Sequence, residues 1–146
     1  MTSSTVVALG TAAAAALAIF GAVYSGALNP AADAPHSAPT LWLLTTLRDR
    51  GIALRARDAR PPLDLMAERR VVAGAGNYDA MCANCHLSPG VPSSELSRGL
   101  YPRPPALADE LAPIDPRTAY WVIKHGIKAS GMPAWGASMP DNNVWD

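Results

Sequence analysis

The sequence predicts a mainly helical protein, in which an apolar N-terminal segment precedes a small, loop-rich domain. Three observations support this. Residues 5–28 carry no charge, residues 71–82 and 115–126 have helix-forming patterns, and the composition is 49% hydrophobic but only 6% aromatic, with 14 prolines. The formal net charge of zero argues against nucleic-acid binding. The domain therefore has few large side chains with which to build its own core.

The N-terminal segment, residues 5–28, is long and apolar enough to span a bilayer as a helix. The residues before it contain no Lys or Arg, whereas a cleavable signal peptide usually begins with a basic region. Ser25 and Ala27 are small enough to leave a cleavage site open. We expect residues 1–28 to be an uncleaved anchor, with a signal peptide as the alternative.

Residues 29–70 are predicted to be a linker and extension. Residues 29–39 are rich in Ala and Pro, as in an extended tether. Residues 41–70 contain seven Arg against four acidic residues, which is compatible with either a docking or lipid-headgroup surface or a solvated face. Pro61-Pro62 should end any helix before Arg60. The apolar side chains that follow, Leu63, Leu65 and Met66, are expected to pack onto the domain.

The central motif is Cys82-Ala83-Asn84-Cys85-His86, which contains both cysteines of the chain and follows a predicted helix from residue 71. Cys-x-x-Cys-His is typical of covalent c-type haem attachment, in which the two thiols take the vinyl groups and the histidine binds iron. A zinc site would need a second pair of ligands, and a thioredoxin-like pair would follow a strand. Haem attachment is the favoured interpretation, and it places the domain outside the bacterial cytoplasm.

Residues 87–115 form a proline-rich stretch that is predicted to be a long loop with brief helical turns at most. Such a loop can wrap the proximal edge of a haem. A prolyl carbonyl in Pro104-Pro105-Ala106-Leu107 can accept the second imidazole N–H of His86 and fix its tautomer. Arg103 is a candidate partner for a haem propionate, or alternatively a solvated arginine.

A further helix is expected from Asp115, as the N-cap before Pro116, to a stop at Gly126. Trp121 within it carries an indole N–H that could donate to a propionate, although packing in the core would also account for it. His125 lies in the last turn, where positive charge suits the helix dipole, and is expected to be a surface residue rather than an iron ligand.

Met132 is the candidate sixth ligand of the iron. It lies in Gly131-Met132-Pro133-Ala134-Trp135, a tight loop that presents a thioether between a flexible and a rigid residue. Methionine favours ferrous iron and raises the reduction potential, which suits an electron carrier. Met139, which also precedes a proline, is the alternative ligand.

Residues 71–146 resemble a class I, single-haem bacterial cytochrome c, here with a membrane anchor. The resemblance rests on the pentapeptide, on Gly74 with Tyr78, on Pro105-Ala106-Leu107 and on the Met132 loop. It implies a small all-α fold around one haem c, with His86 and Met132 as axial ligands and Leu107 in the haem site. Family members end in a helix that crosses the first helix at the Gly/aromatic pair. This sequence stops soon after Asp141, so we expect that helix to be truncated and the Gly74 face to be partly uncovered.

The resemblance implies a non-enzymatic one-electron carrier in the periplasm, or the cytochrome subunit of an oxidoreductase complex. Its expected partners are a dehydrogenase, a quinol-oxidising complex or a terminal oxidase. The alternative is a haem enzyme or gas sensor with an open or labile sixth position, although no acid–base pair for peroxide chemistry is evident. A structural haem in an anchoring subunit is a third hypothesis.

Overall fold

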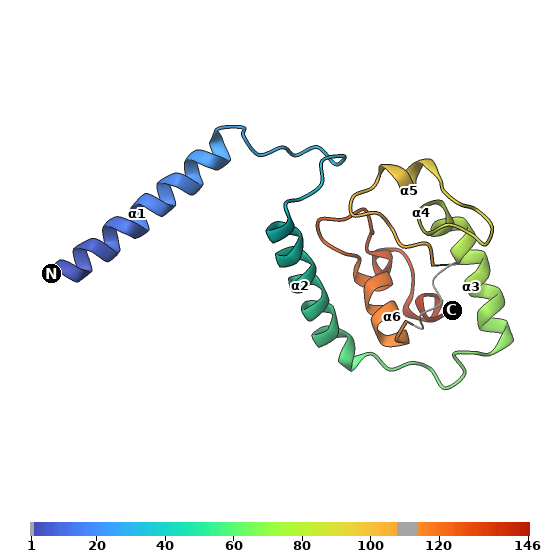
Figure 1. The fold of residues 1–146 in the computed structure, drawn as a ribbon. Helices are drawn as coiled ribbons and strands as arrows, with labels where there is room; N and C mark the ends of the chain where they lie inside the picture. The colour runs from blue at the N-terminus through green and yellow to red at the C-terminus, as the bar shows by residue number, and fades with distance from the viewer. Residues whose placement is uncertain (1, 108–113) are drawn as a thin grey trace. The chain divides into compact units, whose positions relative to one another are not determined.

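The computed structural model describes residues 2–107 and 114–146, and it divides the chain into two compact units, one ending at Ala34 and the other spanning Pro35–Asp146. Every regular element in the described residues is a helix (Figure 1). The prediction of an all-α protein is therefore confirmed. The expected division into residues 1–28, 29–70 and 71–146 stays a prediction.

Helix α1, Ser3–Tyr24, makes up most of the first unit. Its 22 residues span roughly 33 Å at 1.5 Å per residue, enough to cross the hydrocarbon core of a bilayer. All of its described side chains are exposed. Among the described residues it is the one helix long and apolar enough to cross a membrane, a property that signal sequences share.

The first helix of the second unit is α2, Ala38–Arg55, which begins within the segment predicted to be an extended tether. The Ser37 side chain caps it by accepting from the Thr40 N–H. The 3₁₀ turn η1, Ala56–Asp58, follows and ends before Arg60-Pro61-Pro62, as expected. Both elements pack against helix α6, Pro116–His125. Much of the segment predicted to be a linker is thus part of the compact unit.

Two details of the connection to the next helix differ from expectation. Leu63 is fully exposed and Met66 is 84% exposed. They do not pack onto the domain as their apolar character suggested, whereas Leu65 between them is half-buried.

Helix α3, Glu68–Met81, begins three residues before the predicted start and runs into Cys82 as expected. It is followed by α4, Ala83–His86, and by α5, Glu95–Gly99, a brief helix inside the predicted loop. A capping box between Ser94 and the fully buried Ser97 holds α5. Residues 108–113, the rest of that loop, lie outside the described residues.

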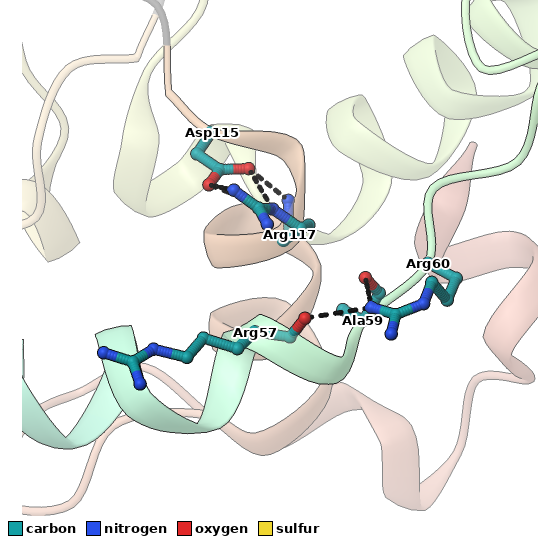
Figure 2. Close-up of polar contacts among 5 residues, drawn as sticks. All are labelled: Arg57, Ala59, Arg60, Asp115 and Arg117. Atoms are coloured by element: carbon teal, nitrogen blue, oxygen red, sulfur yellow. Dashed lines mark hydrogen bonds and ion pairs between the residues drawn. The ribbon is translucent and has the colours of Figure 1, made fainter.

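Helix α6 has the predicted ends. Asp115 accepts from the Arg117 N–H at 3.0 Å, Pro116 is the first helical residue, and Gly126 ends the helix with a φ of 65°. Figure 2 shows the Asp115 carboxylate paired with the Arg117 guanidinium as well. This pairing lowers the pKa of Asp115, because the side-chain hydrogen bond from Arg117 favours the charged carboxylate.

The C-terminal helix α7, Asp141–Trp145, packs against α3 at Gly74. A Cβ at Gly74 would collide with the backbone carbonyl of Asp146, so the close approach requires glycine there. Arg70 of α3 donates to the Asp146 carboxylate at 2.6 Å, and Val144 is only 7% exposed. Gly74 and Tyr78 are half-buried, in agreement with the expectation of a partly covered face.

Candidate haem site

The attachment segment is fixed by a tyrosine one helical turn before it. The Tyr78 hydroxyl donates to the His86 carbonyl at 3.2 Å and to the Leu87 carbonyl at 2.6 Å. Leu87 is buried and has a φ of 65°, which is uncommon for a residue other than glycine, and these bonds stabilise that backbone conformation directly after the motif. The aromatic residue predicted to pack beside a helix crossing thus also positions the end of the Cys82–His86 segment.

Cys82 joins α3 to α4 and Cys85 lies in α4, and neither forms a disulfide. Burial raises the pKa of the Cys82 thiol, and charge on the nearby Cys85 raises it further. Both cysteines are therefore free to form the two thioether bonds that attach a c-type haem.

The proximal histidine has the predicted acceptor. His86 Nδ1 lies 3.0 Å from the Pro105 carbonyl oxygen, and the Leu107 N–H donates to the His86 carbonyl at 3.2 Å. A proton on Nδ1 that is donated to Pro105 leaves Nε2 with its lone pair free to bind a metal. Two residues of the proline-rich loop thus fix both the tautomer and the position of the imidazole.

The Met132 loop is held from both sides. The Ile127 N–H donates to the Met132 carbonyl at 3.2 Å, and the Met132 N–H donates to Ser130 Oγ at 3.1 Å. A Cβ on Gly131 would lie 2.6 Å from Leu100 Cδ2, so the loop packs closely against the Leu100 side chain. These contacts hold Met132 at the cavity described next.

A cavity of about 340 Å³ brings the predicted residues together. Its mainly apolar lining includes both cysteines, His86, Met132, Arg103, Pro105 and Leu107, together with Val122 and Ile123 of α6. No carboxylate and no second histidine lines it among the described residues. An apolar cavity with paired thiols, an imidazole, a thioether and cationic groups fits a covalently attached haem.

Three other residues weighed as haem-site candidates lie elsewhere. Trp121, predicted to donate to a propionate, does not line this cavity; it lines an open groove of about 400 Å³ with His125 and Trp145. The reason is helical geometry, since Val122 and Ile123 face the cavity and leave Trp121 on the opposite side of α6. Met139, the alternative to Met132, does not line the cavity.

Sequence reasoning did not predict several residues of the cavity lining, of which Arg48 of α2 is the charged one. It belongs to the arginine-rich segment, in which it has no distinguishing sequence context. Only the packing of α2 against α6 brings this residue to the cavity.

Residues 69–146, just over half of the chain, match the protein family described as cytochrome c oxidase, cbb3-type, subunit III. Comparisons with curated proteins and with solved structures gave no significant match. The matched range contains the Cys82–His86 motif, so the family and the geometry agree on a covalently bound c-type haem. The chain therefore belongs to the family of cbb3-type cytochrome c oxidase subunit III, whose haem domain is a class I cytochrome c that acts in electron transfer.

Proposed function

We propose that this protein is a one-electron carrier whose single haem c is attached to Cys82 and Cys85 and ligated axially by His86 and Met132. The observation that carries the proposal is that the imidazole and the thioether line one apolar cavity, with His86 Nδ1 engaged by the Pro105 carbonyl. Haem iron, when bound, supplies exchange between the ferrous and ferric states. The thioether of Met132 favours the ferrous state, which suits a carrier.

The surrounding residues orient the group and exclude water. The Pro105 carbonyl favours the His86 tautomer with its proton on Nδ1, and the Leu107 N–H holds the backbone of the same residue. Arg103 lines the cavity and can donate two parallel hydrogen bonds to a propionate carboxylate. With His86 and Met132 both bound to the iron, little rearrangement of this apolar pocket would be needed when the haem gains or loses an electron, which would favour rapid electron transfer.

The cavity lining favours a carrier over a haem enzyme. Peroxide or oxygen chemistry needs a positioned acid–base group on the distal side. Along the described lining, His86 is the one histidine and no Asp or Glu is present, and in this proposal Met132 would fill the sixth position of the iron. We therefore propose that the domain itself does not turn over a substrate, even where it serves as a subunit of an oxidoreductase complex.

Carbon monoxide binding to the reduced holoprotein tests this function. If Met132 closes the sixth position, the wild-type protein should bind carbon monoxide slowly or not at all, whereas Met132→Ala should bind it rapidly. Met139→Ala is the matched control and should behave as wild type. Rapid binding by the wild-type protein would instead favour a haem enzyme or gas sensor with an open or labile sixth position.

We propose further that residues 1–28 anchor the protein in the bacterial inner membrane, with the haem domain in the periplasm. The apolar helix α1 and the attachment of haem c outside the cytoplasm support this placement. Its redox partners would be a dehydrogenase, a quinol-oxidising complex or a terminal oxidase, and the description of the family favours an oxidase. Protease added to spheroplasts should digest the haem domain, and protection until the membrane is lysed would contradict the orientation.

A further inference from the structure

Arg48 is a charged side chain of the haem cavity that comes from outside the part of the chain matched by the family. It lies on α2, Ala38–Arg55, whereas the match begins at residue 69. Its side chain is 36% exposed, so it is partly covered while still lining the cavity. The extension therefore contributes a cationic group to the cofactor site.

The charges of the cavity suit a dianionic group. Among the described lining residues, Arg48 and Arg103 are the two permanent cations and no carboxylate is present. Haem carries two propionates, and arginine pairs with carboxylates through parallel N–H···O bonds. Arg103 alone would leave one propionate without a permanent cationic partner in this lining.

Three other arginines of the same segment form hydrogen bonds or ion pairs within the protein. Arg60 donates to the backbone carbonyls of Arg57 and Ala59 (Figure 2), and Arg55 donates to that of Gly51. Arg70 pairs with Asp64 and Asp146. In the described part of the chain Arg48 is paired through Nε alone, at 2.7 Å from Asp49 Oδ1. Its terminal amino groups therefore stay available to a ligand.

We propose that Arg48 binds one haem propionate, so that α2 is part of the haem site and Asp49 orients the guanidinium. The inference rests on the proposed attachment of haem to Cys82 and Cys85. A cation at a propionate favours the ferrous state, because the reduced haem carries one positive charge fewer. Asp49 opposes this effect by placing a negative charge beside the same guanidinium.

The test is the midpoint potential of the full-length holoprotein in detergent, measured for Arg48→Gln, Arg48→Lys and Asp49→Asn. Arg48→Gln should lower the potential by an amount equivalent to about a tenfold change in the ferrous/ferric ratio, or about 59 mV for one electron. Arg48→Lys should recover part of this shift, since lysine keeps the charge but not the paired geometry. Asp49→Asn should raise the potential.

The matched control is Arg50→Gln, which removes the same charge from an exposed position two residues along α2 that does not line the cavity. It should leave the potential close to that of the wild type. Resonance Raman bands of the propionates should shift in Arg48→Gln and stay unchanged in Arg50→Gln. Equal potentials and unchanged Raman bands in these two variants would overturn the proposal.

Failure of this inference is distinguishable from failure of the proposed function. A wild-type protein with normal His/Met spectra, combined with an unshifted Arg48→Gln, would refute the role of Arg48 alone. If Arg48→Gln loads no haem, the other two variants test the proposal. The midpoint potential should then be lower than that of the wild type in Arg48→Lys and higher in Asp49→Asn. Unshifted potentials in both of those variants would refute it.

Discussion

Helix α3 contains two glycines whose substitution by alanine should have opposite effects on stability. At Gly74 the new methyl group would collide with the carbonyl of Asp146 and displace α7. At Gly76 no atom outside the helix lies within 4 Å of the position of a Cβ. Both residues are in the interior of the same helix, so their intrinsic helix propensities are directly comparable.

The magnitudes follow from what each alanine changes. Alanine stabilises a helix interior by about 0.8 to 1.0 kcal/mol relative to glycine, and Gly76→Ala should gain that amount. Gly74→Ala gains it too, but displacing α7 exposes Val144, whose burial contributes about 1.5 to 3 kcal/mol. The net result is a destabilisation of about 0.5 to 2 kcal/mol. Loss of the Arg70–Asp146 ion pair would increase this destabilisation. The two side chains are only 12% and 14% exposed, so solvent screens their attraction little.

Denaturant unfolding of the holoprotein, followed by circular dichroism, measures both variants against the wild type. We expect the midpoint to fall for Gly74→Ala and to rise for Gly76→Ala, with the slope unchanged. If Gly74→Ala is as stabilising as Gly76→Ala, α7 does not pack on α3 as described.

Two further predictions concern hydrogen bonds. Tyr78→Phe removes the donor to the buried Leu87 carbonyl and should destabilise the holoprotein by about 1 to 3 kcal/mol in the same assay; an unchanged midpoint would contradict the role of the hydroxyl. The hydrogen bond from Lys124 lowers the pKa of Asp141 below its usual 3.8. Its contribution to stability is therefore present above pH 3.8 and is lost as the pH falls through the lowered value. Asp141→Asn should be less stable than wild type near neutral pH, and the difference should vanish in acid; a difference independent of pH would refute this.

Local signals predicted much of the fold and the site. Asp115, Pro116 and Gly126 act through contacts within a few residues, so the ends of α6 follow from sequence. The haem motif is likewise contiguous. Pro105 could be predicted as the acceptor of His86 because proline carbonyls are available in a short loop segment that has to wrap the proximal side.

Long-range packing was not predictable in the same way. Arg48 reaches the cavity only because α2 packs on α6, and no pattern within residues 41–70 indicates that contact. Leu63 and Met66 look like core residues by composition but are exposed. The position of Trp121 could have been predicted from the sequence. On a helical projection of α6 it lies opposite Val122 and Ile123, so these three side chains cannot all face one cavity.

The central claim, His86/Met132 ligation in a covalent haem domain, is tested most directly by the absorption spectrum of the ferric holoprotein. The wild type should show the weak long-wavelength band of methionine-ligated ferric haem. Met132→Ala should lose this band, and Met139→Ala should keep it. A band that persists unchanged in Met132→Ala would contradict the claim and exclude Met132 as the sixth ligand.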